Sequence, residues 1–259
     1  MKTREIADHI ASWLRDYAER SRMRGFVVGV SGGIDSAVTS TLAAMTGRPL
    51  LAVEMPIHQA PAHMRRAREH IEQLETRYGN VSSVEADLTR VLEALIDALP
   101  ETGNAVRREL SLANTRARVR MTTLYYFAAL EKDLVVGTGN KVEDFGVGFY
   151  TKYGDGGVDL SPIADLTKSE VYSLGNILEV PDSILKAPPT DGLWGDNRTD
   201  EDQIGASYPE LEWAMTFSGD EEALDPRQCE VLAIYLRHHA TNRHKMDPIP
   251  VCKIPPHLR

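Results

Sequence analysis

The chain is poor in cysteine and in net cationic charge. Only Cys229 and Cys252 occur among 259 residues, which excludes a disulfide framework and a zinc site built from several thiolates. Cys229 lies on an apolar helical stripe with Leu232 and Leu236, so we expect a packed thiol and not a nucleophile. Asp and Glu outnumber Lys and Arg by 38 to 29, and the net charge of −9 argues against a nucleic-acid-binding protein.

Long apolar runs are also missing. No stretch is long enough to span a bilayer, and residues 1–5 predict the start of an amphipathic helix and not a secretory signal, so we expect a cytoplasmic protein without membrane partners. The length fits one α/β domain over residues 1–259, with an N-terminal helix near residues 3–22 and a C-terminal helical extension. A cysteine-based glutaminase domain would need a longer chain than this. If the protein transfers nitrogen, we therefore expect free ammonia or a partner protein to supply it.

The most informative stretch is an apolar run that breaks into small residues. It begins with Phe26, Val27 and Val28 and continues through Gly29, Val30, Ser31, Gly32, Gly33, Ile34, Asp35 and Ser36. The pattern predicts a buried strand, a tight turn and a helix N-terminus. Because the first N–H groups of a helix lack internal partners and carry partial positive charge, such a turn favours anions. Gly32 and Gly33 would let phosphate oxygens approach the main chain, and the two serines offer hydroxyls.

Asp35 gives this loop an unusual charge. Its carboxylate would repel phosphates unless a divalent cation lies between them, so we expect Mg²⁺. The loop lacks the lysine of the GxxxxGK(S/T) motif and the GxGxxG pattern of dinucleotide-binding folds. Residues 31–36 instead resemble the pyrophosphate loop of ATP pyrophosphatases, which break ATP between its α- and β-phosphates and form acyl-adenylates. The alternative is an ordinary glycine-rich turn, but the flanking strand and helix favour the functional interpretation.

Two further apolar runs extend this unit into a sheet. Residues 50–56 form a second buried strand after the first helix, which completes a βαβ unit. Residues 133–140 end in Gly-Thr-Gly-Asn and precede a helix that carries Glu143. Because open parallel sheets bind ligands at such strand ends, Thr138 would donate to a phosphate, unless it only caps the helix, and Glu143 would complete a metal site with Asp35. We expect an α/β fold with a doubly wound, mostly parallel sheet and helices on both faces.

Two groups of arginines occur on predicted helices. Arg65, Arg66 and Arg68 lie one turn from glutamates, so we expect solvated ion pairs and assign them no chemistry. On a later helix, Arg118 and Arg120 are two residues apart and cannot point the same way, so at most one need reach a pocket.

A glycine-rich loop and a helix start follow. Residues 146–160 combine glycines with aromatic, cationic and acidic side chains, a composition that suits a loop folding over a ligand better than a plain linker. Thr167 and Glu170 predict a capping box, which explains the next helix start without any function. Lys168, inside that box, would face an anion at the helix N-terminus.

Taken together, these motifs resemble one family, the ammonia-dependent NAD synthetases. The resemblance covers residues 29–36, 114–121 (NTRARVRM), 137–143, 150–157 (YTKYGDGG), 166–168, 186–190 (KAPPT) and 244–245. Their order and spacing span most of the chain, and the KYGDGG segment is more selective than the phosphate loop. The family implies a Rossmann-like fold of the adenine nucleotide α-hydrolase type. It also implies that deamido-NAD, ATP and ammonia react through an adenylate to give NAD, AMP and pyrophosphate.

The resemblance also implies roles for residues that match by motif. Gly29 to Ser36, Thr138, Lys168 and Thr190 would bind ATP, and Asp35 with Glu143 would hold Mg²⁺. The residues expected to contact deamido-NAD are Arg118, Lys152, Asp159, His244 and Lys245. Asp35 and Lys168 are catalytic candidates, and Asp155 is our candidate for positioning ammonium or accepting its proton. The family is homodimeric, with the dinucleotide at the subunit interface.

One residue departs from the pattern of this family, and two other functions have to be weighed against the one that the resemblance implies. Glu54, near the adenine side, occupies a position where we expect a basic or neutral residue. A different adenylating enzyme, such as a tRNA-thiolating or GMP-forming one, would predict a basic RNA surface, reactive cysteines or an attached glutaminase, which the sequence does not show. A non-catalytic adenine-nucleotide-binding module would have no use for Glu143 or for residues 152–157.

Overall fold

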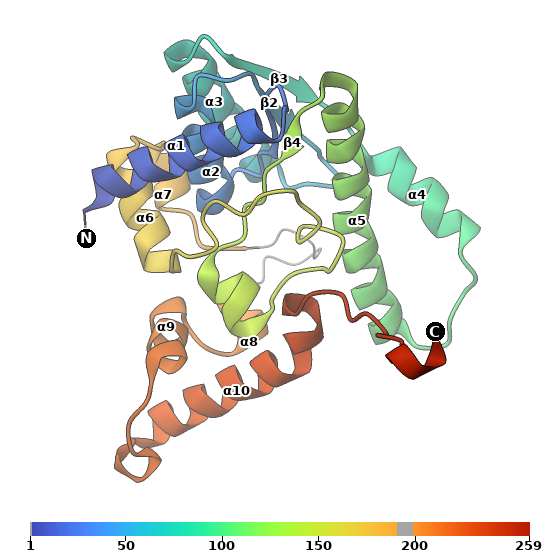
Figure 1. Ribbon diagram of the computed structural model, residues 1–259, viewed down its shortest axis with the longest axis vertical. Helices are drawn as coiled ribbons and strands as arrows, with labels where there is room; N and C mark the ends of the chain where they lie inside the picture. Colours follow the sequence, from blue (N-terminus) through green and yellow to red (C-terminus); the bar gives the residue numbers. More distant parts are fainter. Residues whose placement is uncertain (1, 191–198) are drawn as a thin grey trace.

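The computed structural model describes residues 2–190 and 199–259. Three prolines, Pro181, Pro188 and Pro189, predict an irregular connection over residues 184–197, which lies partly outside this range. The centre of the structure is a parallel sheet with the strand order β3-β2-β1-β4 (Figure 1). The strands are β1 (Phe26–Gly29), β2 (Leu50–Glu54), β3 (Val81–Glu85) and β4 (Leu134–Val135). The three predicted apolar runs therefore form neighbouring strands, which accounts for their β-branched, two-sided hydrophobic composition.

Helices cover both faces of this sheet, as Figure 1 shows for α2 and α5. One face carries α1 (Thr3–Arg20), α2 (Ile34–Met45), α3 (Pro61–Arg77), α6 (Lys168–Ile177) and α7 (Asp182–Leu185), and the other carries α4 (Thr89–Ala98) and α5 (Ala105–Glu131). Alternate residues of β1 divide between the two layers. Phe26 and Val28 pack in the core with α2, whereas Val27 packs with Ala128 of α5. The predicted α/β class with helices on both faces is confirmed.

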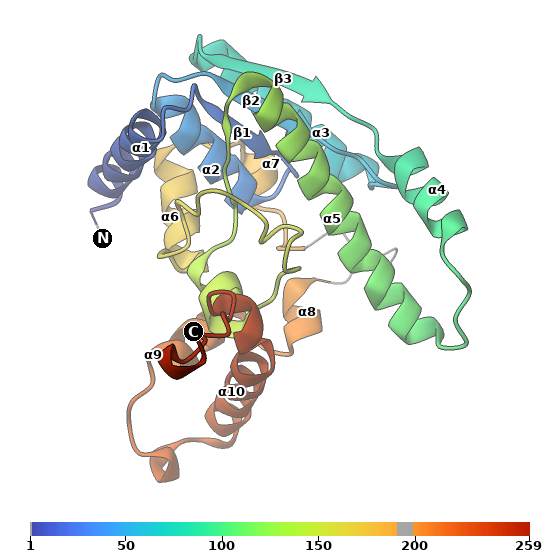
Figure 2. The same ribbon diagram turned by 45° about the vertical axis from the view of Figure 1, so that its right-hand side comes forward.

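The C-terminal part forms a separate group of helices below the sheet (Figure 2). It contains η1 (Val142–Val147), α8 (Asp200–Ile204), α9 (Tyr208–Thr216), η2 (Glu221–Ala223), α10 (Pro226–Met246) and η3 (Pro256–Leu258). Val142 and Val147 of η1 pack against Leu211 of α9 and Val231 of α10. The expectation of a buried Cys229 is wrong, because its thiol is exposed. The core-facing stripe of α10 runs through Val231 and Ile234 instead.

The strand order places a crevice beside β1. The chain proceeds from β1 outward to β2 and β3 and then returns to add β4 on the other side of β1. At such a switch point the loops that follow the two adjacent strands diverge and leave room for a ligand. The phosphate loop follows β1, and the Gly-Thr-Gly-Asn segment follows β4. In residues 2–190 and 199–259, no helix combines the length and hydrophobicity that crossing a membrane requires.

Candidate active site

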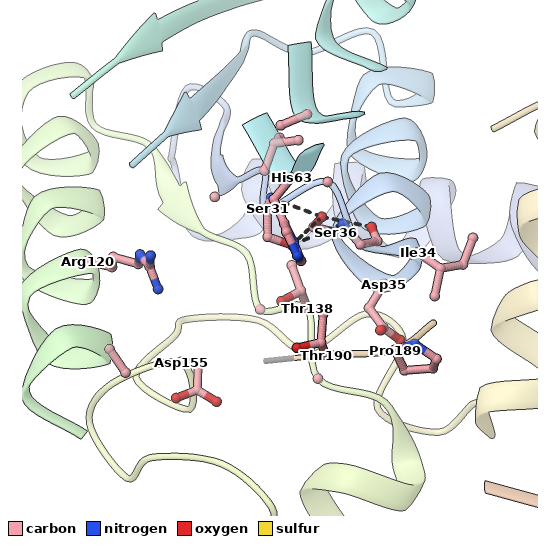
Figure 3. A pocket seen from close by; sticks show the side chains of 18 of the residues that line it. Ser31, Ile34, Asp35, Ser36, His63, Arg120, Thr138, Asp155, Pro189 and Thr190 are labelled. Atoms are coloured by element: carbon pink, nitrogen blue, oxygen red, sulfur yellow. Dashed lines mark hydrogen bonds between the residues drawn. The ribbon is translucent and has the colours of Figure 1, made fainter. Parts of the chain in front are cut away.

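A cavity of about 270 Å³ opens at the carboxyl ends of β1, β2 and β4. Every residue from Gly29 to Ser36 lines it, and so do Thr138, Glu143, Asp155, Lys168 and Thr190. In the view of Figure 3, Thr138 and Thr190 are drawn below Ser31, with Asp155 to one side of them and Asp35 to the other. The fold therefore gathers in one cavity the residues that the sequence assigned to ATP, to metal and to catalysis.

The phosphate loop has a conformation that only glycine allows at its tightest point. Gly32 has φ +80°, and a Cβ there would meet the carbonyl oxygen of His63 at 2.6 Å. Ser31 and Ser36 join across the turn with their hydroxyl oxygens 3.1 Å apart, and the Ser36 hydroxyl donates to the carbonyl of Gly33 at 3.0 Å. Gly33 precedes α2 and has no side chain to cap the first N–H groups of the helix. These groups are therefore available to an anion.

Lys168 joins two acids that are far apart in the sequence. Its Nζ lies 2.6 Å from Asp35 Oδ2 and 3.0 Å from Glu143 Oε1, and only 3% of the residue is exposed. Burial opposes a charge on this amine, but the two carboxylates outweigh burial and raise its pKa. The ammonium therefore stays charged at neutral pH. The predicted capping box that positions Lys168 at the start of α6 is confirmed, with both the Thr167 and the Glu170 bonds formed.

Asn140 also links the two acids, because its side chain bonds the carboxylate of Asp35 and the backbone at Glu143. It is fully buried, and its Nδ2 donates to Asp35 Oδ1 at 3.1 Å. Its Oδ1 accepts from the backbone N–H groups of Val142 and Glu143 at 3.0 and 3.1 Å. One amide therefore holds the carboxylate of α2 beside the turn that carries Glu143. The sequence placed Asn140 at a ligand-binding strand end but gave no sign of this role.

Tyr208, from the C-terminal group of helices, also contacts Glu143 and Lys168. Its hydroxyl donates to Glu143 Oε1 at 2.5 Å and lies 3.2 Å from Asp200 Oδ2. The Lys168 ammonium lies 4.6 Å from the centre of its ring, within cation–π range. Burial and the neighbouring carboxylates raise the pKa of Tyr208, so the phenol remains a donor. Nothing in the sequence around Tyr208 indicated this contact.

Replacing Tyr208 by phenylalanine should destabilise the protein by about 1–3 kcal/mol, because Glu143 then loses a buried donor. Urea denaturation measures this loss. Tyr235→Phe is the matched control, since Tyr235 is half-buried in the same group of helices and its hydroxyl has no hydrogen-bond partner in the described residues. Equal stabilities of the Tyr208 and Tyr235 variants would contradict the assigned role of the hydroxyl.

Two more acidic residues, Asp144 and Asp155, line this part of the cavity. Burial, aided by the charges of Glu143, Asp155 and Asp35, raises the pKa of Asp144 to about 8. Burial also raises the pKa of Asp155 to about 6. The Asp155 carboxylate accepts the Thr151 N–H at 3.0 Å and keeps an exposed edge toward the cavity. A polyphosphate could enter this acidic environment only with additional positive charge.

The five residues expected to contact deamido-NAD do not line this cavity. Arg118 donates to the carbonyl of Lys152 at 3.2 Å, and Lys152 Nζ donates to the carbonyl of His244 at 2.6 Å. These three residues form a linked group where α5, the glycine-rich loop and α10 meet. Asp159 accepts from Tyr125 and from the Val135 N–H, and Lys245 donates to the carbonyls of Gly148 and Tyr150 at 2.7 and 2.8 Å, so both have internal partners.

The expectation that at most one of Arg118 and Arg120 reaches a pocket is confirmed. Arg120 lines the cavity and donates to Gln59 at 2.9 Å, whereas Arg118 lies outside it. The expectation that the arginines of α3 only form solvated ion pairs is wrong for Arg66. That residue lines the cavity and donates from Nε to the carbonyl of Gly32 at 3.1 Å. Its position follows from the packing of α3 on the phosphate loop, which a helical charge pattern alone does not reveal.

The fold and this cavity define an α/β nucleotide-binding protein with a phosphate loop after its first strand. The chain belongs to the NAD synthase family, whose model matches residues 6–245. It is 37% identical over 223 residues to the NH(3)-dependent NAD(+) synthetase of Carboxydothermus hydrogenoformans, a match that covers 85% of this chain and 89% of that protein.

Two other relatives extend this likeness over nearly the whole chain. Identity to the NH(3)-dependent NAD(+) synthetase of Methanosarcina mazei is 36%, with 97% of this chain and 98% of that protein covered. A solved structure of NMN synthetase from Francisella tularensis is similar with a TM-score of 0.85 at 31% identity, and the match covers 98% of this chain and 100% of that chain.

Proposed function

We propose that this chain is an ammonia-dependent ligase that amidates deamido-NAD to NAD, while ATP is converted to AMP and pyrophosphate. The observation that carries this proposal is the convergence of Asp35, Glu143 and Lys168 beside the phosphate loop of one cavity. Family membership and curated relatives named NH(3)-dependent NAD(+) synthetases support the same activity.

The reaction follows from the weakness of a carboxylate as an acceptor for ammonia, because direct attack would have to expel oxide. In the first step, a pyridine carboxylate oxygen forms a bond to the α-phosphorus while the bond to the departing pyrophosphate breaks. In the second step, ammonia bonds to the carbonyl carbon, and AMP leaves with the former carboxylate oxygen. One proton of the ammonia nitrogen passes to a base.

ATP would be held by the phosphate loop together with residues from other segments. The open N–H groups at the start of α2 suit the outer phosphates, and Thr138 and Thr190 offer hydroxyls in the same cavity. Lys168 would neutralise the charge that develops on the departing pyrophosphate. Removing one such preorganised contact raises a barrier by about 3 kcal/mol.

Asp35 and Glu143 fit a magnesium site. Both carboxylates already face one positive charge, the Lys168 ammonium, from opposite segments of the chain. Mg²⁺ in nucleotide sites is bound by one or two carboxylates, with phosphates and water completing its shell. When bound, Mg²⁺ would neutralise phosphate charge and make the α-phosphorus more electrophilic. In residues 2–190 and 199–259, no group of three or more His, Cys, Asp or Glu side chains is arranged to hold a metal.

We propose that Asp155 positions ammonium or accepts its proton. Its carboxylate lines the cavity, and its pKa of about 6 leaves it mostly ionised at neutral pH but basic enough to take a proton. Asp144 lines the same part of the cavity, and its pKa of about 8 leaves it mostly protonated at neutral pH, so the negative charge that would attract ammonium comes from Asp155.

Replacing Asp155 by asparagine should slow amide formation and stabilise the folded protein. The raised pKa means that the charged carboxylate opposes folding at pH 8, and this penalty fades as the pH falls through 6 toward 4. The full shift corresponds to about 3 kcal/mol, but cavity water screens the exposed side chain, so we expect a gain of about 1 kcal/mol. Urea denaturation at pH 8 and pH 5 measures this gain, which should be smaller at the lower pH.

The activity of the same variant tests the role of Asp155 as a base. The concentration of free ammonia falls as the pH is lowered in every sample, so the informative quantity is the turnover of the variant divided by that of the wild type. This ratio should be lowest above pH 6 and rise toward one below it, because protonation removes the base from the wild type as well. A ratio that does not change with pH would argue against the role.

We also propose a homodimer with deamido-NAD at the subunit interface. The helix α5 exposes four large apolar side chains, Val106, Leu110, Tyr126 and Leu130. Val106 and Leu110 lie one turn apart on one face of α5, and so do Tyr126 and Leu130 on another; paired exposed apolar side chains of this kind suit a protein interface. The group of Arg118, Lys152 and His244 lies at one side of α5, where it would contact the part of the dinucleotide that extends beyond the cavity. Sedimentation equilibrium tests the oligomeric state. The cytoplasmic location and the single domain over residues 1–259 stay predictions.

The experiment that tests the function is an assay of the purified chain with ATP, Mg²⁺, deamido-NAD and ammonium. NAD, AMP and pyrophosphate should appear in equal amounts. Glutamine in place of ammonium should give no NAD if no partner is present. Production of ADP and phosphate, or no dependence on deamido-NAD, would contradict the proposal.

A second candidate differs only in the size of the substrate. The similarity to the NMN synthetase structure favours amidation of the corresponding mononucleotide to NMN. The mononucleotide and the dinucleotide substrates carry the same reacting pyridine carboxylate, so the same groups of the cavity would act on either substrate. Values of kcat/KM for the mononucleotide and the dinucleotide, measured at saturating ATP and ammonium, decide between them.

A further inference from the structure

The helix α3 lies directly against the phosphate loop. The carbonyl oxygen of His63, in its first turn, is so close to Gly32 that no side chain would fit there. Arg66 follows one turn later and donates from Nε to the Gly32 carbonyl at 3.1 Å. Both His63 and Arg66 line the cavity, and Figure 3 shows His63 beside Ser31. A cationic side chain from α3 is therefore attached to the anion-binding loop itself.

The charge of Arg66 is not matched by a nearby acid. Arg68, half a turn away, pairs with Glu54 and with Glu85, and Arg77 pairs with Glu179. Arg66 has no carboxylate within ion-pair distance in residues 2–190 and 199–259. Burial and the adjacent Arg65 lower the pKa of its guanidinium, although it remains charged at neutral pH. An anion that enters the cavity would therefore stabilise the charge of this partly buried guanidinium.

Glu54, at the end of β2, increases the need for positive charge in the cavity, which Arg66 can supply. Glu54 lines the same cavity, is 6% exposed and occupies the position where a basic or neutral residue was expected. Its carboxylate adds to the negative charge that Asp35, Glu143 and Asp155 already give the cavity. Positive charge for a polyphosphate must therefore come from other elements, and Arg66 of α3 is attached to the loop that would hold the outer phosphates.

We propose that Arg66 is a further ATP-binding residue of this chain, which binds the pyrophosphate part of the nucleotide. Nε is used by the Gly32 carbonyl, and within residues 2–190 and 199–259 the two terminal amino groups of the guanidinium have no hydrogen-bond acceptor, so they can donate to phosphate oxygens as a pair. The same contact couples the position of Arg66 to the conformation of the loop. This inference rests on the proposed function, since it assumes that the cavity binds ATP.

Isothermal titration calorimetry on Arg66→Gln tests this assignment without turnover. The ligands are α,β-methylene-ATP, pyrophosphate and AMP, each with Mg²⁺. Loss of a charge-assisted contact should weaken binding of the ATP analogue and of pyrophosphate about tenfold or more, while AMP binding stays within about twofold. Arg66→Lys, which keeps the charge but not the planar pair of donors, should give a smaller loss. Arg65→Gln removes an equal charge from the exposed neighbour and should leave all three affinities unchanged.

The three ligands separate a phosphate contact from a structural one. Unchanged pyrophosphate affinity in Arg66→Gln would overturn the proposal. Equal weakening of AMP and pyrophosphate would also overturn it, because that result means that Arg66 only supports the shape of the cavity. If wild-type protein bound neither the ATP analogue nor pyrophosphate, the proposed function would fail first, and the two failures are therefore distinguishable. Thermal unfolding of each variant shows whether the fold is retained.

Discussion

Replacing Asp35 by asparagine should lower deamido-NAD-dependent pyrophosphate release by about 10²–10³-fold while the protein remains folded. Asparagine keeps the oxygen that accepts from Asn140 at 3.1 Å, and Lys168 retains Glu143 as a partner at 3.0 Å. The change therefore removes one negative charge from the site and little of its packing. Since Asp35 is proposed both to hold Mg²⁺ and to orient Lys168, the loss should appear in the first half-reaction.

Asp182→Asn is the matched control for this variant. Asp182 is an exposed acid that pairs with Lys186 on the protein surface and does not line the cavity. Its replacement should leave pyrophosphate release unchanged. If Asp35→Asn released pyrophosphate at the wild-type rate, Asp35 would have no part in the chemistry, and the proposed metal site would be wrong as well.

Replacing Lys168 by methionine should reduce both activity and stability. In the folded protein without ligands, the ammonium is the cation that Asp35 and Glu143 share, at 2.6 and 3.0 Å. Removing it leaves two largely buried carboxylates facing each other, which we expect to destabilise the protein by about 3 kcal/mol. Turnover should fall by about 10²–10³-fold, because the departing pyrophosphate loses a preorganised cation.

Urea denaturation and the pyrophosphate assay measure these two effects separately. Lys141→Met is the control, since Lys141 pairs with the exposed Asp165 at 2.9 Å, an interaction worth at most about 1 kcal/mol. Equal stability of the two methionine variants would show that the buried ion pair contributes nothing. Full activity of Lys168→Met would remove it from the proposed mechanism.

The sequence predicts local features of this protein well. The change from apolar to small residues after Val28 predicts the end of β1 and the start of α2, because glycine and serine are needed where the backbone turns. Thr167 and Glu170 predict a helix start whose hydrogen bonds depend on only four consecutive residues. The parallel sheet follows from apolar runs that alternate with helices.

Contacts between distant segments are less predictable from the sequence. Lys168 is 133 positions from Asp35, and only the resemblance to a family indicated that they share a site. Tyr208 reaches Glu143 because α9 packs below η1, and no pattern near Tyr208 signals this. The burial of Cys229 was predicted wrongly for a related reason. A helix with two partly apolar sides does not reveal which side meets the core until its neighbours are known.

The family assignment also bears on the two alternatives from the sequence. A different adenylating enzyme would share the loop after β1 but would not be expected to match the NAD synthase family over residues 6–245. A module that only binds nucleotide would not require Lys168, Asp35 and Glu143 to be gathered beside the phosphate loop at the energetic cost of burying three charges. The arrangement therefore favours catalysis over simple binding.

Isotope transfer shows whether the carboxylate of the substrate attacks the α-phosphorus, the step on which the proposed activity depends. Deamido-NAD labelled with ¹⁸O in its pyridine carboxylate is converted in the presence of ATP, Mg²⁺ and ammonium, and the products are analysed by mass spectrometry. AMP should carry one ¹⁸O atom and pyrophosphate none. Label in inorganic phosphate, accompanied by ADP, would mean attack at the γ-phosphorus and would rule out the adenylate route.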